Sequence, residues 1–94
     1  MTVIILDGSE WRSPADFYSA LLPQLGAPVW HGANLDALYD SLSGNINCLE
    51  PPFTIEVRET AGLSHETKAY LTKVEQVFVD ARKNFGISVY FKID

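Results

Sequence analysis

The sequence predicts a single α/β domain in which three short parallel strands form a small sheet, with about four helices packed mainly on one side of it. Three observations lead to this prediction. Short apolar runs have the patterns of strands, and the longer segments between them carry apolar residues at helical spacing. The resulting order, β-α-α-β-α-β, returns each strand in the same direction after a helical crossover, which favours parallel pairing. Residues 1–94 supply one hydrophobic core and not two.

The first strand and the first helix are marked by their ends. Residues 2–6 form a largely β-branched run, which is typical of a buried strand. Ser13 is a good N-cap and Pro14 suits the first helical position, so we expect a helix to begin here. Pro23 lies inside this helix and is expected to kink it or to end it early, before Gly26 closes the segment.

The second half of the chain predicts two more strands around one long helix. Residues 53–58 alternate between apolar and polar side chains, as a half-exposed strand does. Residues 59–62 are expected to form a short turn of helix. A long helix capped by Ser64 should run from about residue 65 to residues 84–86, and residues 87–93 should form the last strand.

The composition restricts the compartment and the class of partner. Nothing resembles a signal peptide, no apolar stretch approaches the span of a bilayer, and Cys48 has no second cysteine to pair with, so we expect a cytoplasmic protein. The net charge is −5, and the segment between Arg12 and Arg58 contains acidic residues but no lysine or arginine. This acidic half argues against nucleic acid as a direct ligand, because phosphate contacts need cations, and it suits a basic protein partner.

Residues 30–44 combine an ordinary apolar face with an unusual polar one. In a helix from about Ala33 to Gly44, the apolar stripe consists of Leu35, Leu38, Tyr39 and Leu42. The opposite face consists of Ala33, Asp36, Ala37, Asp40, Ser41, Ser43 and Gly44. Its two carboxylates lie one turn apart, where they repel each other, and its other side chains are small instead of the long charged ones that usually cover a solvated face. Close approach by a cationic surface explains this pattern, and so does a polar face that happens to carry aspartate.

Within this stretch the chain resembles the barstar family of ribonuclease inhibitors. The residues that carry the resemblance are Gly32, the run Asn34-Leu35-Asp36-Ala37-Leu38, Asp40, Leu42 and Gly44. Further support comes from Asp7-Gly8 after the first strand, Glu56 and Arg58 at the end of the second, and Gln76-Val77-Phe78 in the last helix. The resemblance therefore extends over essentially the whole chain.

The resemblance implies a barstar-like fold and a non-enzymatic inhibitor that blocks the active site of a small, basic, secreted ribonuclease, either barnase-like or guanyl-preferring. In the family, an acidic helix and the loop before it enter the nuclease cleft, where one aspartate takes the place of an RNA phosphate. That aspartate corresponds to Asp40, and Asp36 is the second carboxylate. We expect no cofactor, no metal and no membrane partner, a monomer when free, and a heterodimer with the target.

The expected partner-binding residues are Trp30, His31, Gly32, Asn34, Leu35, Asp36, Tyr39, Asp40, Ser43, Gly44 and Asp80. Trp30 either stacks in the nuclease cleft or belongs to the core. His31 stands where the family usually has an aromatic residue, and it either adds a pH-sensitive contact or has no role. Gly32 is expected to let the loop approach its partner without a Cβ, and Asn34 to cap the helix or to donate to the partner. Asp80 stands where the family has an acidic side chain one methylene longer.

Two other functions remain open from the sequence. His31, Asp36 and Asp40 are compatible with a base-and-carboxylate cluster or an oxygen-rich metal site, although these three residues alone are a weak signal in so short a chain. An interaction module of the same fold, such as a regulatory domain or an immunity protein against another class of toxin, is the stronger alternative, because a fold does not fix a function.

Overall fold

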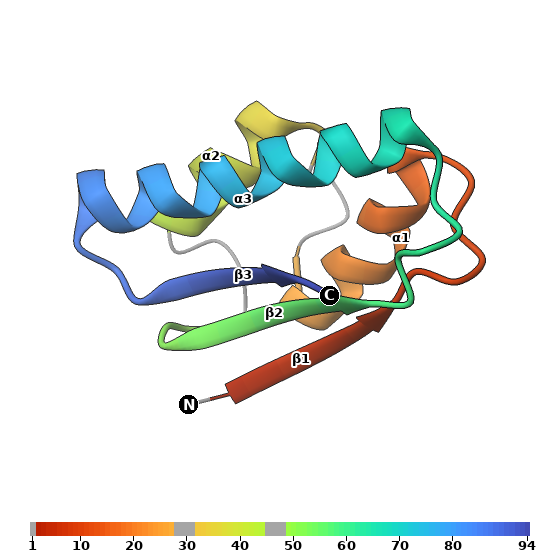
Figure 1. Cartoon of the computed structure of the whole chain (residues 1–94). Coiled ribbons are helices and arrows are strands. Elements are labelled where there is room, and N and C mark those ends of the chain that lie inside the picture. Colours follow the sequence, from red (N-terminus) through yellow and green to blue (C-terminus); the bar gives the residue numbers. More distant parts are fainter. Residues whose placement is uncertain (1, 28–31, 45–48) are drawn as a thin grey trace.

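The structure, a computed structural model, describes residues 2–27, 32–44 and 49–94 and confirms the predicted order of elements (Figure 1). The strands are β1 (Thr2–Asp7), β2 (Phe53–Arg58) and β3 (Val89–Ile93), and the helices are α1 (Pro14–Leu25), α2 (Leu35–Gly44) and α3 (His65–Phe85). The described residues therefore contain three helices, and the expectation of about four was wrong. None of the described helices is long and apolar enough to span a lipid bilayer.

The segment expected to form an extra turn of helix, residues 59–62, is a non-helical turn. Glu59 has a left-handed φ of 61°, which a right-handed helix does not permit. The N–H of Leu63 then donates to the carbonyl of Thr60 at 3.1 Å and closes the turn. The chain thus passes directly from the end of β2 to the capped start of α3 at Ser64.

The strands run parallel in the order β1-β2-β3, so β2 is the central strand. Ile55 of β2 lies opposite Ile4 of β1 on one side and opposite Phe91 of β3 on the other. Each crossover leads to the next strand along the sheet, and crossovers of one hand then place their helices on the same face. Figure 1 shows the described helices on one side of the sheet, with the other side bare, as the sequence predicts.

The core lies between the sheet and the helices. Every second residue of β2, namely Phe53, Ile55 and Val57, is buried there. From α3, Phe78 packs against the edge strand β3 and the central strand β2: its ring centroid lies 5.3 Å from that of Phe91 and 6.5 Å from that of Phe53. This packing fixes α3 over the sheet, and α3 in turn provides the surface on which α2 packs.

Helix α1 begins directly after Ser13, as predicted, and continues two residues past Pro23. It therefore does not end early at the proline. Leu21 and Leu25 are fully buried, and their burial holds the last turn in place although the proline has no N–H to donate. Gly26 ends the helix with a left-handed φ of 66°, and its N–H donates to the carbonyl of Pro23 at 3.1 Å.

Candidate functional site

Helix α2 begins at Leu35, two residues later than the sequence predicts, because Asn34 caps it. The Asn34 Oδ1 atom accepts a hydrogen bond from the backbone N–H of Ala37 at 2.8 Å, and the Asn34 carbonyl accepts one from the N–H of Leu38 at 3.0 Å. The side chain thereby satisfies one of the N–H groups that a helix N-terminus leaves without a partner. Of the two roles expected for Asn34, capping is confirmed.

The glycine before this cap is required by the packing of the chain itself. A Cβ atom on Gly32 would lie 2.9 Å from Nδ2 of Asn34 and 3.2 Å from Cβ of Ala37. Both distances are shorter than ordinary van der Waals contact, and Asn34 cannot move away without losing the capping hydrogen bond. Gly32 was expected to allow a partner to approach, and the structure adds an internal reason for a glycine here.

The buried face of α2 is rotated relative to the predicted one. Leu38 is fully buried, as predicted. Ser41, which was predicted on the opposite polar face, is also buried, and its Oγ donates to the carbonyl of Leu38 at 2.9 Å. This acceptor within the helix removes most of the cost of burying a hydroxyl. Leu35 and Tyr39 are only partly buried, so the buried face is turned away from Tyr39 and toward Ser41.

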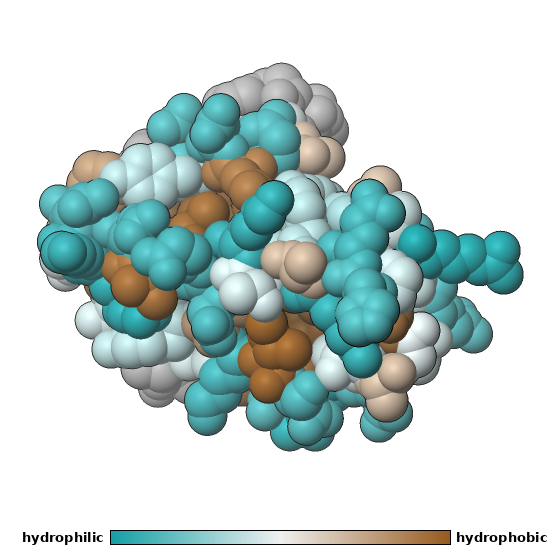
Figure 2. Space-filling model, turned by 45° about the horizontal axis from the view of Figure 1, so that its top comes forward, coloured by the Kyte–Doolittle hydropathy of each residue, from teal (hydrophilic) through white to brown (hydrophobic). Residues whose placement is uncertain are grey.

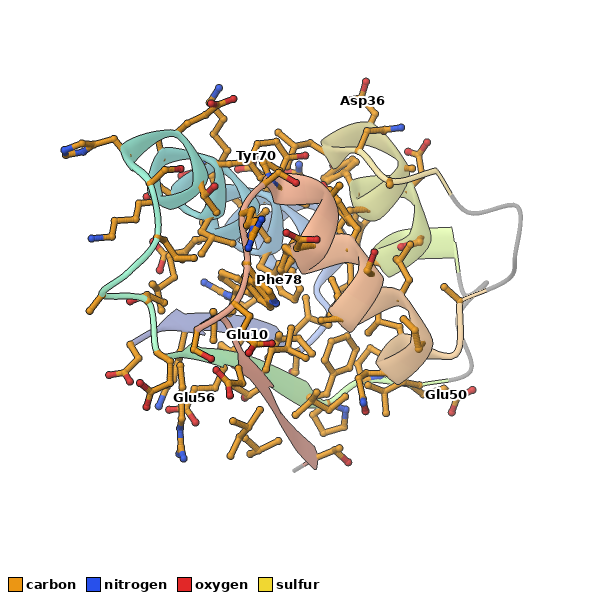
Figure 3. The ribbon with its side chains drawn as sticks, turned by 90° about the vertical axis from the view of Figure 1, so that its right-hand side faces the viewer. Glu10, Asp36, Glu50, Glu56, Tyr70 and Phe78 are labelled. Carbon is orange, nitrogen blue, oxygen red and sulfur yellow. The ribbon has the colours of Figure 1, made fainter. Side chains whose placement is uncertain are left out.

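Asp36 and Asp40 are both exposed, one turn apart on the side of α2 that faces away from the core. Figure 3 shows Asp36 projecting outward from the helix. It lies in the first turn, where the helix dipole stabilises a negative charge. No lysine or arginine of the described residues forms an ion pair with Asp36. The helix side of the molecule is largely hydrophilic, with separate apolar areas (Figure 2).

Tyr39 joins α2 to the C-terminal end of α3. Its hydroxyl accepts a hydrogen bond from Nδ2 of Asn84 at 2.9 Å, and its ring centroid lies 5.3 Å from that of Phe85. Phe85 is still 44% exposed. Neither Asn84 nor Phe85 is among the predicted site residues. Their one signal in the sequence is a large apolar residue just before Gly86, at the predicted end of the helix.

Asp80 lies on α3, the helix against which α2 packs. Its side chain is partly buried, and its carboxylate accepts a hydrogen bond from Nε2 of Gln76, one turn earlier on the same helix, at 2.9 Å. The Asp80 carboxylate is therefore held along α3 by a neutral donor, and this hydrogen bond brings no positive charge to it.

The structure does not describe the side chains of the remaining predicted site residues. Trp30 and His31 lie outside the described residues. Ser43 and Gly44 complete the backbone of α2, and nothing beyond that is described for them. Among the residues that the structure describes, no group of three or more histidine, cysteine, aspartate or glutamate side chains is arranged to hold a metal ion.

The comparison with known families agrees with the resemblance seen in the sequence. The chain matches the family model described as Barstar (barnase inhibitor) over residues 1–93. This match leaves out only the last residue of the 94, and it includes both carboxylates of α2 and the glycine and asparagine before them. The chain therefore belongs to the barstar family of barnase inhibitors.

Proposed function

We propose that this protein inhibits a small, basic, secreted ribonuclease, barnase-like or guanyl-preferring, by placing the exposed carboxylates of α2 in its catalytic cleft. The observation that carries the proposal is the outward-facing pair of Asp36 and Asp40 in a chain of the barstar family. The Asp40 carboxylate occupies the position of an RNA phosphate among the cations of the nuclease, and Asp36 supplies the second negative charge.

The chemistry of the target makes a carboxylate pair effective. An enzyme that cleaves RNA concentrates positive charge where the phosphodiester binds, and a carboxylate offers the same cations a negatively charged oxygen acceptor. A charge that is already held in the bound position loses little freedom on binding. Here the Asn34 cap fixes the start of α2, and the contact of Tyr39 with Asn84 fixes it against α3. Both supports act on the helix that carries the pair.

The charge distribution also speeds the encounter. The net charge is −5, and no lysine or arginine lies between Arg12 and Arg58, so a basic nuclease is attracted toward the acidic half of the chain. Such attraction is screened within about 8 Å at physiological ionic strength, so the association rate should fall steeply as salt is added. An association rate that is independent of salt would contradict this part of the proposal.

The direct test is inhibition of RNA cleavage. Purified protein is titrated into a panel of barnase-like and guanyl-preferring ribonucleases, and cleavage of a fluorogenic RNA is followed. We expect complete inhibition of at least one enzyme at a ratio near one to one. Asp40→Asn, which keeps the shape and removes the charge, should raise the inhibition constant strongly, whereas Glu75→Gln on the exposed side of α3 should leave it unchanged.

The proposed site of action is the cytoplasm of the producing cell, in a complex of one inhibitor with one ribonuclease. If no ribonuclease of the panel is inhibited, and the protein instead forms a tight complex with a toxin of another class, the chain is an interaction module that shares the barstar fold. Loss of binding on removal of the Asp40 charge would still locate the contact on α2 in that case.

A further inference from the structure

The two edge strands of the sheet differ in how well they are closed to another strand. On β3, the Val89 carbonyl points away from β2, because the preceding carbonyl, that of Ser88, accepts from the N–H of Phe53 at 3.1 Å and successive peptide groups alternate. Arg82 donates a hydrogen bond from Nη1 to this Val89 carbonyl at 2.8 Å, and its guanidinium carbon lies 4.8 Å from the centroid of the Tyr90 ring. At the start of β3, the chain itself therefore occupies an edge carbonyl and places a charged side chain beside it, and both features oppose pairing with a further strand there.

The edge of β1 has no such protection among the described residues. The N–H of Gly8 donates to the Arg58 carbonyl at 2.8 Å, so the even-numbered residues of β1 bond to β2 and the odd-numbered ones point outward. Val3 and Ile5 thus present their N–H and C=O groups at the edge, and their side chains, 54% and 51% exposed, lie on the bare face of the sheet. Residues 2–6 include no proline and no charged residue, and the pairing with β2 is continuous.

We infer that β1 pairs antiparallel with β1 of a second copy of this chain, joining two sheets into one of six strands. With the twofold axis at Ile4, Val3 of each copy lies opposite Ile5 of the other. These are pairs of outward-pointing residues, so each exchanges two backbone hydrogen bonds, and the four side chains form one aliphatic cluster.

The strand matches itself better than it matches a foreign strand of arbitrary sequence. Residues 2–6 are uncharged, so the symmetric register brings no two like charges opposite each other, and it pairs only β-branched residues around the axis. The same register places Asp7 beyond the pairs that form the centre of the interface. Shifting the axis by one residue would place the aspartate opposite Val3 and lose the aliphatic match.

The dimer is weak and depends on concentration. One pair of six-residue strands buries well below the total of about 1,200 Å² that a standard stable interface needs. Each copy also carries a net charge of −5, and the resulting repulsion opposes association. Added salt should therefore strengthen this dimer, whereas it should slow association with a basic nuclease. With such a dimer, the monomer expected from the sequence would be the state at low concentration.

The inference does not depend on the proposed function. Helix α2 packs on α3, whereas β1 contacts β2 and α1, so β1 pairing leaves the exposed carboxylates of α2 accessible. In a dimer, the α2 helix of each copy would remain free to bind its own partner.

The test is the oligomeric state of the full chain and of one variant at each edge. Sedimentation velocity from about 10 μM to about 1 mM should show a monomer–dimer equilibrium that shifts toward dimer with salt. Ile5→Lys should weaken dimerisation by at least about tenfold, because it places a charge of the same sign in both aliphatic pairs. Ser88→Lys, which adds the same charge at an exposed residue beside the opposite edge strand, should leave the equilibrium unchanged. Thermal unfolding confirms that both variants are folded.

Amide hydrogen exchange identifies the edge. The amides of Val3 and Ile5 should gain protection as the concentration rises, since both acquire hydrogen-bond acceptors in the dimer. A chain that stays monomeric at about 1 mM in high salt would overturn the inference. A dimer that survives Ile5→Lys, or that leaves the two amides unprotected, would also overturn it and would indicate packing through another surface.

Discussion

Helices α2 and α3 pack against each other, but their exposed sides are built differently. On α3 the exposed side mixes lysine and glutamate with long stems, and Arg82 and Lys83 in the last turn suit the negative end of the helix dipole. On α2 the exposed side has two aspartates of one sign and otherwise short side chains. The exposed side of α3 therefore has pairings that favour the helix, whereas the two like charges of α2 oppose it, as expected if α2 serves the proposed contact with a basic partner.

The shorter helix depends on the longer one for its position. Helix α3 has 21 residues and α2 has 10, and isolated helices of about that shorter length are marginal in water. The contact of Tyr39 with Asn84 and Phe85 lies at the end of α3 and holds the middle of α2. Changes on α3 should therefore affect folding first, and changes on the exposed side of α2 should affect binding first.

The largest expected effect is on binding, at α2. Asp40→Ala should cost about 3–5 kcal/mol of binding free energy with the target ribonuclease, because it leaves the opposing cations desolvated without a partner. The melting temperature should barely change, since Asp40 is exposed. Isothermal titration and thermal unfolding measure the two quantities. Glu75→Ala on α3 is the matched control, and an equal loss in both variants would show that only net charge matters.

The next effect is on stability, at α3. Leu71 is fully buried, so Leu71→Ala should lower the free energy of unfolding by about 2–4 kcal/mol through lost burial and a residual cavity. Leu71→Met, which keeps the volume, should cost less than about 1.5 kcal/mol. Urea unfolding measures both. The folded fraction of Leu71→Ala should bind the target with unchanged affinity. A weaker affinity of that folded fraction would mean that α3 contributes to binding as well as to stability.

A smaller effect depends on alkaline pH. Burial raises the pKa of Tyr18 above its ordinary value of 10.0, and the 2.7 Å hydrogen bond with Tyr70 of α3 adds to the shift. The folded state keeps the phenol proton where the unfolded chain loses it. This contribution to stability is therefore complete below about pH 10 and is lost as the pH rises further, at up to about 1.4 kcal/mol per pH unit. Urea unfolding between about pH 8 and about pH 11 measures how the free energy of unfolding changes with pH.

The control for the alkaline transition is a second tyrosine. Tyr18→Phe should flatten the dependence of the unfolding free energy on pH, whereas Tyr90→Phe, at a more exposed tyrosine on β3, should leave it as it is. If both variants have the slope of the unmodified protein, other groups are responsible for the loss of stability.

The smallest expected effect concerns the start of α2. Asn34→Ala removes the acceptor for the Ala37 N–H and should lower the free energy of unfolding by about 1 kcal/mol. Asn34→Asp keeps an acceptor at this position and should restore most of the stability, which thermal unfolding can measure. If the aspartate variant is as unstable as the alanine variant, the asparagine acts through its amide nitrogen and not as a cap.

Local signals in the sequence were sufficient for the order of the elements and for most of their ends. Ser13, Pro14 and Gly26 marked the ends of α1, and the alternation in residues 53–58 marked β2, because caps, turns and strand periodicity act between neighbours in the chain.

Local signals were not sufficient for strand burial: residues 2–6 were expected to form a buried strand, but β1 lies at the edge of the sheet and only Leu6 in it is buried. The turn at Glu59 was missed, since a left-handed φ at a glutamate leaves no compositional signal.

Tertiary contacts were the part that the sequence could not supply. The burial of Ser41 depends on how far α2 rotates as it packs on α3, and a period of 3.6 residues does not determine that rotation. The hydrogen bond of Asn84 with Tyr39 joins residues that are distant in the chain. The exposure of Asp36 and Asp40 was predictable, because both lie well away from the leucine stripe.

Because helices cover only one face of the sheet, tolerance to substitution should alternate from residue to residue along each strand. Along β2, Ile55 and Val57 face the helices, whereas Glu56 and Arg58 lie on the uncovered side and bind each other at 3.0 Å. In a library of single variants, the residues that face the helices should accept few replacements, and the exposed residues of the uncovered side should accept many. The exposed positions of the uncovered side can therefore be redesigned without rebuilding the interior, whereas Thr54, only 8% exposed on that side, should tolerate few replacements.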